Sequence, residues 1–198
     1  ILYQYLTAVE HLGLRAILVI NKSDLLEDDH QELLDRFETY ASIGYPVLTI
    51  STKQHTGEEK LRSSLKGESS ILVGQSGVGK SSLVNMLLPD LDVQTGALSK
   101  TSGLGKHTTS SATLYFLPQG GTLIDSPGVR SFRLLINERA ELEQGFREFA
   151  PFLGHCQFSD CRHEQEPGCA LTEAVESGKI AGWRLNHFRL MAQALGKT

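Results

Sequence analysis

Residues 74–81 read Gly-Gln-Ser-Gly-Val-Gly-Lys-Ser and match the pattern G-x-x-x-x-G-K-[ST]. Glycines let the backbone turn tightly and point its N–H groups at phosphate oxygens, and the N-terminus of a following helix favours negative charge. In this pattern Lys80 reaches the β- and γ-phosphates, and the Ser81 hydroxyl binds Mg²⁺. An apolar run precedes the turn and a helical pattern follows it, which favours a nucleoside-triphosphate site over a structural glycine turn. The predicted phosphate-binding residues are Gly74, Gln75, Ser76, Gly77, Val78, Gly79, Lys80, Ser81 and Ser82.

A second motif, Asn-Lys-Ser-Asp at residues 21–24, indicates which base is bound. Guanine presents two N–H donors that one carboxylate accepts as a charge-assisted pair, and adenine presents no such pair. We expect Asp24 to accept these donors, Lys22 to lie along the base, and Asn21 to tie this loop to the phosphate loop. Residues 51–53, Ser-Thr-Lys, resemble the S-A-K loop whose backbone N–H meets guanine O6. The predicted base-binding residues are Asn21, Lys22, Asp24, Ser51, Thr52 and Lys53.

The order of the motifs along the chain is unusual. Residues 125–128, Asp-Ser-Pro-Gly, match D-x-x-G and follow a predicted strand. In an ordinary G domain the phosphate loop comes first, followed by the switch threonine, D-x-x-G, N-K-x-D and S-A-K. Here N-K-S-D and S-T-K come first, so the chain is predicted to be a circularly permuted G domain. Permutation places the D-x-x-G switch next to the segment that follows it, so that a C-terminal module can respond to the nucleotide state.

Predicted strands and helices alternate around these motifs, which indicates an α/β fold with a mostly parallel sheet. Residues 92–111 are rich in Gly, Ser and Thr and are predicted to form a long functional loop. After about Phe132 the pattern becomes helical. Helices are predicted at 3–12, within 25–42, at 58–65 and at 80–88, and strands at 15–20, 45–50, 70–73, 112–117 and 122–124.

All three cysteines lie between Cys156 and Cys169, in the spacing Cys156-x4-Cys161-x-His163-x5-Cys169. Three cysteines and one histidine are a standard closed set for structural zinc. His155 is a rival to His163 as the fourth ligand, and buried cysteines beside a surface histidine are the alternative to a metal site. An odd number of cysteines in one short cluster argues against a disulfide framework and for a reduced, cytoplasmic protein.

Composition narrows the function further. The 198 residues include 19 Lys and Arg and 23 Asp and Glu, a formal net charge of −4. This balance excludes a general nucleic-acid binder. The stretch 96–133 holds four cations and one acid, Lys100, Lys106, Arg130 and Arg133 against Asp125. These cations form either a local basic patch or the dispersed charges of a solvated loop. The longest apolar run near the start, residues 16–20, is too short to span a membrane.

Taken together, the chain resembles the ribosome small subunit-dependent GTPases of the RsgA type over nearly all of its length. The stretches that carry the resemblance are NKSDLL, GQSGVGKSSLVN, GLGKHTT, GGTLIDSPGVRSF and CQFSDCRHEQEPGCAL. The resemblance implies a permuted G domain at 1–135, a zinc-binding helical domain at 136–198, and an OB-fold in front of Ile1. It also implies binding of GTP and GDP, and GTP hydrolysis that the small ribosomal subunit stimulates late in its assembly. Small departures are Thr52, Lys106 and Ser110, of which Lys106 could weaken a phosphate contact to ribosomal RNA.

Phosphoryl transfer to water depends mostly on positioning and charge neutralisation. Lys80 is expected to neutralise the phosphates together with Mg²⁺, which Ser81 and a switch threonine would hold. The resemblance favours Thr109 over Thr108 for that ion. Asp125 is expected to hold a water bound to the metal.

Two further switch residues complete the expected machinery. The Gly128 N–H is expected to sense the γ-phosphate. Val129 occupies the position where Ras-like enzymes carry the glutamine that orients the attacking water, and valine has no group that could do so. His107 is the best substitute, although a surface histidine that contacts RNA would fit the same position.

Three functions fit these residues. The first is a GTPase that acts on the small ribosomal subunit and its rRNA, without DNA or a membrane as partner, and as a monomer. The second is a nucleotide-gated rRNA-binding module with negligible catalysis. The third, which the N-K-S-D motif disfavours, is another P-loop NTPase such as an ATP-dependent kinase.

Overall fold

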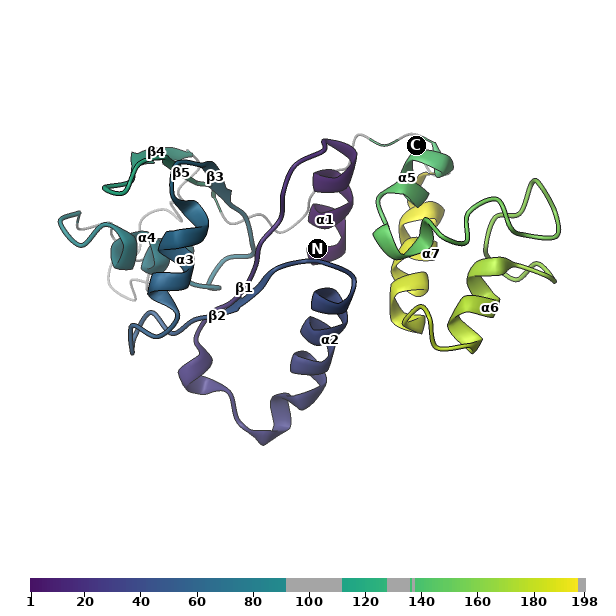
Figure 1. Cartoon of the computed structure of the whole chain (residues 1–198), viewed down its shortest axis with the longest axis horizontal. Coiled ribbons are helices and arrows are strands. Elements are labelled where there is room, and N and C mark those ends of the chain that lie inside the picture. Colours follow the sequence, from purple (N-terminus) through teal and green to yellow (C-terminus); the bar gives the residue numbers. More distant parts are fainter. Residues whose placement is uncertain (92–111, 128–135, 137, 196–198) are drawn as a thin grey trace, which may run out of the picture. The chain divides into compact units, whose positions relative to one another are not determined.

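The structure, a computed structural model, describes residues 1–91, 112–127, 136 and 138–195. The chain folds into two compact units, each built from separate stretches of sequence (Figure 1). The sheet unit comprises Ile17–Phe37 and Pro46–Ser131, and the helical unit comprises Ile1–Ala16, Glu38–Tyr45 and Phe132–Thr198. The division between the two units falls within one helix, α2 (Gln31–Ser42).

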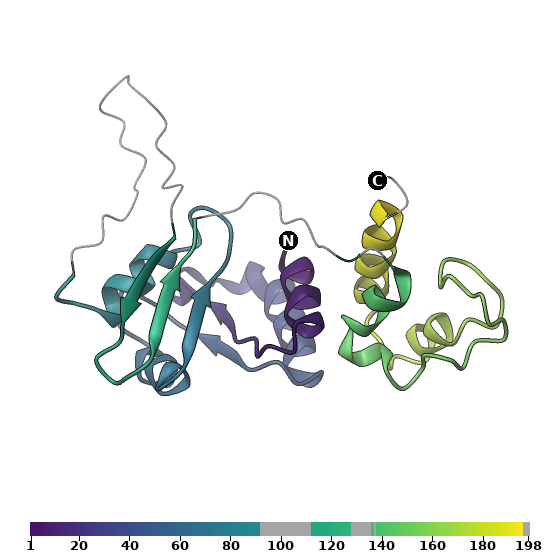
Figure 2. The same cartoon turned by 90° about the horizontal axis from the view of Figure 1, so that it is seen from above.

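The strands of the sheet unit confirm the mixed α/β class. Strands β1 (Leu18–Ile20) and β2 (Val47–Thr49) pair in parallel. A second sheet has the order β3 (Ser69–Leu72), β5 (Thr122–Asp125), β4 (Thr113–Phe116), with β3 and β5 parallel and β4 antiparallel (Figure 2). Hydrogen bonds therefore divide the described strands into two sheets, where the sequence predicted one mostly parallel sheet.

One apolar core joins these strands to two helices. Leu123, on the central strand β5, is fully buried against α3 (Glu58–Leu65) and α4 (Lys80–Leu87). Val19 of β1 and Leu48 of β2 pack against the same core. The bounds of α3 agree with the predicted helix at 58–65, because its apolar residues recur at helical spacing.

Several elements are shorter than predicted, and the reason is clear for two of them. β1 begins at Leu18, whose N–H donates to the Pro46 carbonyl, and not at residue 15. The helix predicted within 25–42 is preceded by short 3-10 turns at Ser23–Leu25 and Asp28–His30. Glu27 caps the second turn reciprocally with His30, so the helix α2 begins only after this capping box.

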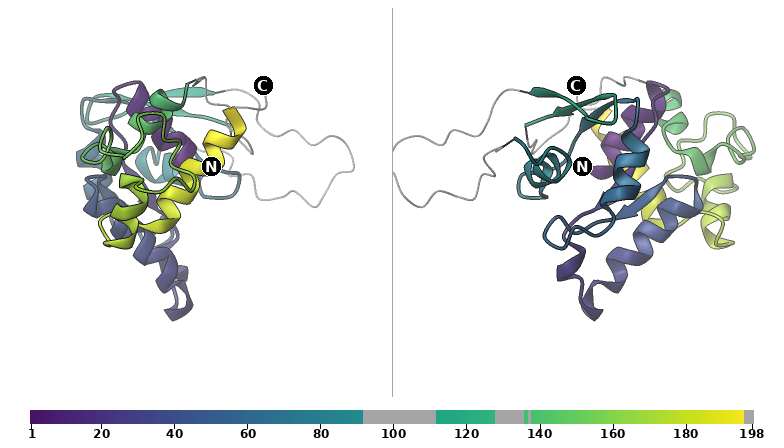
Figure 3. Two further views of the ribbon diagram at one scale, coloured as in Figure 1. Left: turned by 90° about the vertical axis from the view of Figure 1, so that its right-hand side faces the viewer. Right: turned by 60° about the vertical axis from the view of Figure 1, so that its left-hand side comes forward.

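The helical unit has an aromatic core. It contains α1 (Leu2–His11), α5 (Arg139–Gln144), a 3-10 turn at Arg147–Phe149, α6 (Ala170–Glu176) and α7 (Gly182–Leu195) (Figure 3). The rings of Phe146, Phe149 and Phe188 are fully buried, with centroids 4.8 to 5.7 Å apart. In the part of the chain that the structure describes, no helix combines the length and apolar character needed to cross a lipid bilayer.

Helix α1 belongs to this helical unit by direct contact. The Thr7 hydroxyl approaches the Met191 sulfur of α7 at 3.9 Å, and Tyr3 stacks on His187 with ring centroids 4.1 Å apart. A Cβ on Gly145 would lie 2.3 Å from the Thr7 methyl, so only glycine allows this approach. The predicted division at residue 135 follows the sequence motifs, whereas the compact units group residues 1–16 and 38–45 with the C-terminal helices.

Candidate nucleotide site and metal cluster

The phosphate loop lies between β3 and α4, at the carboxyl end of a parallel strand, where α/β sheets bind their ligands. Gly77 and Gly79 have φ angles of +84° and +95°, which disfavour any residue with a Cβ. A Cβ on Gly79 would also lie only 2.2 Å from the Asn21 side-chain nitrogen. The glycine pattern thus serves both the turn and its contact with the base-binding loop. Gln75, Ser76, Gly77 and Val78 lie exposed along this loop, and Ser82 is in the first turn of α4.

Lys80 is folded over the loop that it terminates. Its ammonium donates to the carbonyls of Gly74 at 3.0 Å and Gln75 at 3.1 Å. Partial burial lowers the pKa of Lys80, while the nearby Asp125 carboxylate raises it. The ammonium is therefore held in the phosphate loop, where a phosphate anion could replace the carbonyls as its partner.

Asp125 and Ser81 meet beside the loop because β3 and β5 are neighbours in register, with Leu72 opposite Asp125. The Ser81 hydroxyl lies 3.4 Å from Oδ2 of Asp125. Oδ1 of Asp125 is buried without a hydrogen-bond partner among the described residues. A hydroxyl and a carboxylate with a spare oxygen are suitable donors for Mg²⁺. The residues present therefore fit a magnesium ion, with Ser81 as its ligand.

The base-binding loop contacts the phosphate loop directly, as predicted for Asn21. Its side-chain N–H donates to the Val78 carbonyl at 3.0 Å, and its side-chain oxygen accepts the Lys22 N–H at 2.8 Å. Lys22 is in the left-handed region with a φ of +62°, and its ammonium donates to the Gly77 carbonyl at 2.8 Å. Two hydrogen bonds from side chains to backbone carbonyls thus join the two loops.

Asp24 is oriented by Ser51, a contact that the motif analysis missed. The Ser51 hydroxyl donates to Oδ1 of Asp24 at 2.5 Å and accepts the Gln54 N–H at 3.1 Å. The hydrogen bond from Ser51 holds the pKa of Asp24 below its usual value, with further lowering from Lys53 and Lys22. The signal in the sequence is the serine at the first position of an S-A-K-like loop, but the resemblance to that loop predicts only a backbone contact.

The backbone of the same loop also limits which N–H can meet the base. The Ser51 N–H donates to the Thr56 carbonyl at 3.2 Å. This leaves the N–H groups of Thr52 and Lys53 as the candidates for guanine O6. The predicted switch residues lie outside the described part of the chain: His107, Thr108, Thr109, Gly128 and Val129.

A Ser51→Ala variant is expected to bind guanine nucleotides about 3- to 10-fold more weakly at neutral pH, because Asp24 loses a hydrogen bond that fixes its orientation. In this variant the pKa of the Asp24 carboxyl should also rise toward its usual value. A lowered pKa keeps Asp24 charged as pH falls, so the variant should lose affinity at a higher pH on acidification than the wild type. Fluorescence titrations from pH 4 to pH 7 measure both effects. Ser63→Ala, at an exposed position of α3, is the control. The same loss of affinity on acidification in both variants would refute the role of Ser51.

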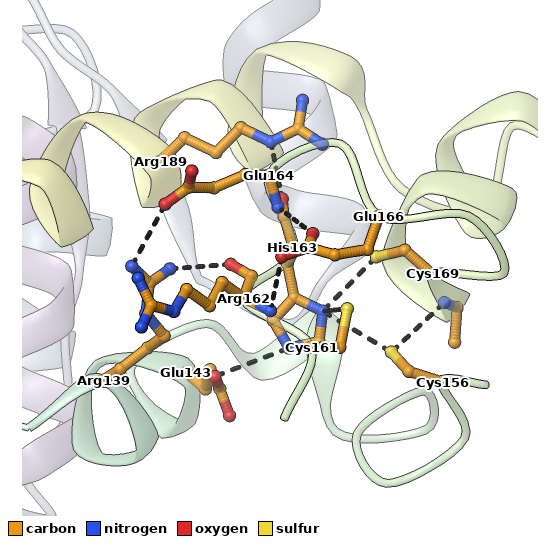
Figure 4. Close-up of polar contacts among 11 residues, drawn as sticks. Arg139, Glu143, Cys156, Cys161, Arg162, His163, Glu164, Glu166, Cys169 and Arg189 are labelled. Carbon is orange, nitrogen blue, oxygen red and sulfur yellow. Dashed lines mark hydrogen bonds and ion pairs between the residues drawn. The ribbon is translucent and has the colours of Figure 1, made fainter. Parts of the chain in front are cut away.

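The predicted cysteine cluster is assembled in the helical unit (Figure 4). The ligand atoms of Cys156, Cys161, His163 and Cys169 all lie within 4.8 Å of one another. Nδ1 of His163 is 3.6 Å from the sulfurs of Cys156 and Cys161 and 3.4 Å from that of Cys169. A tetrahedral zinc with ordinary bond lengths would separate nitrogen and sulfur by about 3.5 Å. The donor set thus fits a structural zinc ion, and the rival ligand His155 is exposed outside it.

The surroundings of the sulfurs differ. Burial raises the pKa of Cys161 to about 12. Burial also raises that of Cys169, but hydrogen bonds from Thr172 and His163 outweigh it and bring the pKa to about 7. The Cys156 sulfur accepts the Ala170 N–H at 3.3 Å, at the start of α6. A bound cation is the partner that would keep all three sulfurs as thiolates.

Comparisons with known proteins identify the family of the chain. The profile of the family RsgA GTPase matches residues 1–135. Two relatives named "Small ribosomal subunit biogenesis GTPase RsgA" are similar in sequence. That from Azotobacter vinelandii is 49% identical over 193 residues, and that from Chromohalobacter salexigens is 50% identical over 192. In both, the match covers 97% of this chain and 56% of the relative. The chain therefore spans about half the length of these relatives.

Two solved structures share the fold. A crystal structure of YjeQ from Thermotoga maritima matches with a TM-score of 0.79 and 36% identity, over 98% of this chain and 64% of that one. YloQ, described as a circularly permuted GTPase, matches with a TM-score of 0.72 and 29% identity, over 99% of this chain and 62% of that one. These matches confirm the permuted architecture that the order of motifs predicted.

Proposed function

Because the chain belongs to the RsgA GTPase family, we propose that it binds and hydrolyses GTP as part of a factor for late maturation of the small ribosomal subunit. The observation that carries the proposal is the joining of the base-binding and phosphate loops. Asn21 and Lys22 both donate to carbonyls of the phosphate loop. One ligand that spans both loops must carry a base and phosphates, and the carboxylate of Asp24 selects guanine.

Each predicted residue has a role in this binding. Asp24 accepts the two guanine donors, and Lys22 lies along the base. An N–H of the loop that contains Thr52 and Lys53 meets O6. Phosphates replace the carbonyls that now accept from Lys80, and the glycine N–H groups cradle them.

Hydrolysis needs few covalent contributions from the protein. Ser81 and Thr109 would hold Mg²⁺, which when bound neutralises charge on the phosphates. Asp125 accepts hydrogen bonds from water beside that ion, and the Gly128 N–H contacts the γ-phosphate. His107 orients the water that attacks the γ-phosphorus, because Val129 cannot.

Zinc is the proposed occupant of the cysteine cluster, where it would have a structural role. The four ligands come from residues 156–169, a segment with little regular structure before α6. Metal binding supplies folding free energy to segments that lack an apolar core of their own. Cys156, Cys161, His163 and Cys169 leave no open position for a catalytic water.

The proposed partner is the small ribosomal subunit through its rRNA, with the protein acting as a cytoplasmic monomer. The names of the relatives support the subunit as partner. The net charge of −4 does not favour general attraction to nucleic acid, so recognition would use the cations near the switch residues. Neither DNA nor a membrane is a proposed partner.

We expect slow GTP turnover by the isolated chain and a rate at least about 10-fold higher with small subunits, since completing a catalytic geometry contributes 10²–10⁴-fold in typical cases. Phosphate release, measured with and without purified small subunits, tests this. The relatives extend beyond the region that this chain matches, so a full-length relative is measured in parallel.

His107→Ala should remove the stimulated rate and leave GTP affinity unchanged, because the side chain would act on water and not on the nucleotide. His55→Ala is the matched control, since that histidine is exposed in the sheet unit and pairs with Glu58. Fast turnover by the His107 variant on the subunit would refute its catalytic role. A single-turnover experiment that detects subunit binding without hydrolysis would favour the nucleotide-gated rRNA-binding module.

A further inference from the structure

His163 faces two chemically different neighbours through its two ring nitrogens. Its side chain is buried, with 5% of the residue exposed. Nδ1 points at the three sulfurs, and Nε2 lies 3.4 Å from Oε1 of Glu143 on α5 (Figure 4). A neutral imidazole carries one proton and one lone pair, so the partner of one nitrogen decides what the other can bind.

We propose that Glu143 is the positioning residue of the metal cluster: its carboxylate accepts the Nε2 proton of His163, so that Nδ1 is the metal-binding atom. This inference rests on the proposed zinc site and names a part of it outside the four ligands. A carboxylate behind a metal-binding histidine fixes the tautomer and ring orientation and makes the ligand more basic.

The backbone of His163 shows why an outside partner is needed. Its φ of +60° lies in the left-handed region, which is unfavourable for residues other than glycine. Arg189 of α7 holds this backbone by donating from Nε to the His163 carbonyl at 2.7 Å. With the backbone fixed, the remaining freedom is rotation of the ring, and the contacts of the ring must set it.

Those ring contacts come from two helices distant from the cluster in sequence. Phe188 of α7 meets the ring at a centroid distance of 6.0 Å and an interplanar angle of 64°, which limits rotation by packing. Glu143 supplies the polar contact on the opposite side from the sulfurs, and its side chain is only 18% exposed. A carboxylate that is largely shielded from water is stabilised by a hydrogen-bond partner, which makes the contact with Nε2–H favourable for both groups.

Helix α5 also holds the segment between the second and third cysteines. Arg139, one turn before Glu143, donates to the Arg162 carbonyl at 2.6 Å and lies 3.3 Å from a Glu164 carboxylate oxygen. One short helix thus fixes both the loop that carries His163 and the ring itself. Its sequence position, immediately after the expected switch region, gives no indication of this role.

The experiment uses the full chain loaded with Zn²⁺. Glu143→Gln keeps an oxygen acceptor, Glu143→Leu removes it, and Glu138→Gln and Glu138→Leu are matched controls at the exposed start of the same helix. Competition with a chromophoric chelator should show a roughly 10- to 100-fold weaker affinity for Glu143→Leu and a smaller loss for Glu143→Gln. The zinc affinity of both controls should stay within about twofold of the wild type, because substitutions at exposed positions usually have small effects.

A spectroscopic measurement on the wild type needs no substitution. Long-range ¹H–¹⁵N spectra of zinc-loaded protein with labelled histidine should show His163 metal-bound at Nδ1 and protonated at Nε2. Metal on Nε2, or wild-type affinity in Glu143→Leu, overturns the inference. If either of these results is found in protein that binds one zinc per chain, the proposed zinc site is kept and only the role of Glu143 is rejected. A wild type that binds no zinc overturns both the zinc site and the role of Glu143. Cobalt absorption typical of three thiolates and one imidazole shows that a variant site still assembles.

Discussion

Asp24→Asn is expected to lower the affinity for GTP by at least about 100-fold, because sites built to hydrogen-bond a polar group reject a mismatch strongly. The amide would present an N–H₂ to the guanine amine, so that donor meets donor. Xanthine carries a carbonyl in place of that amine, and the variant should therefore prefer xanthosine triphosphate. The contact from Ser51, 2.5 Å from Oδ1 of Asp24, would hold the new side chain in the same orientation.

Calorimetric titrations with GTP, xanthosine triphosphate and ATP measure this change of preference. Asp29→Asn is the matched control, since its side chain is 79% exposed and lies on the same segment after the base-binding loop. Unchanged binding of GTP by Asp24→Asn would contradict guanine recognition by Asp24 and favour the alternative that the chain is another P-loop NTPase. Tight ATP binding by the wild type would have the same consequence.

Removal of zinc is expected to unfold much of the helical unit. Structural zinc binds zinc-finger peptides with an apparent free energy of roughly 10–16 kcal/mol, which is comparable to the whole stability of a typical domain, about 5–15 kcal/mol. The cluster also fixes the start of α6, because Cys169 is the N-cap residue of that helix and the Cys156 sulfur accepts the Ala170 N–H. Loss of the ion should therefore release α6 along with residues 156–169.

Thermal unfolding followed by circular dichroism, with and without a strong chelator, tests this expectation, and elemental analysis gives the zinc content. Cys161→Ser should behave like the chelated protein, and Ser159→Ala, exposed in the same segment, should behave like the wild type. GTP affinity should change little in either case, because the sheet unit has an apolar core of its own. Identical unfolding curves before and after chelation would show that the cluster has no structural role.

Local motifs explain which parts of the fold and site could be predicted from sequence. The phosphate loop depends on glycines at fixed spacing between a strand and a helix, and α3 on apolar residues at helical spacing; both are properties of a few adjacent residues. The order of the motifs predicted the circular permutation, which the structural matches confirm. The four cysteine and histidine ligands also lie within one short segment.

Contacts between distant segments could not be predicted in this way. The Ser51 hydroxyl meets Asp24 from another loop, and Glu143 meets His163 from another helix. Arg184 of α7, only 1% exposed, forms a buried ion pair with Glu148, and its guanidinium lies over the rings of Phe146 and Tyr40, at 4.5 and 5.2 Å from their centroids. In the sequence it is one arginine in a helical pattern, with no sign of burial.

The sequence by itself determined the class of fold, the order of the nucleotide motifs and the set of candidate metal ligands, because each depends on residue types at short, fixed spacing. Only the tertiary structure decided that α1 and residues 38–45 pack with the C-terminal helices, and which side chains orient Asp24 and His163. The physical reason is that burial and hydrogen-bond orientation depend on groups brought together by folding. Periodicity and motif spacing describe each segment alone and do not show which distant segment it contacts in the folded protein.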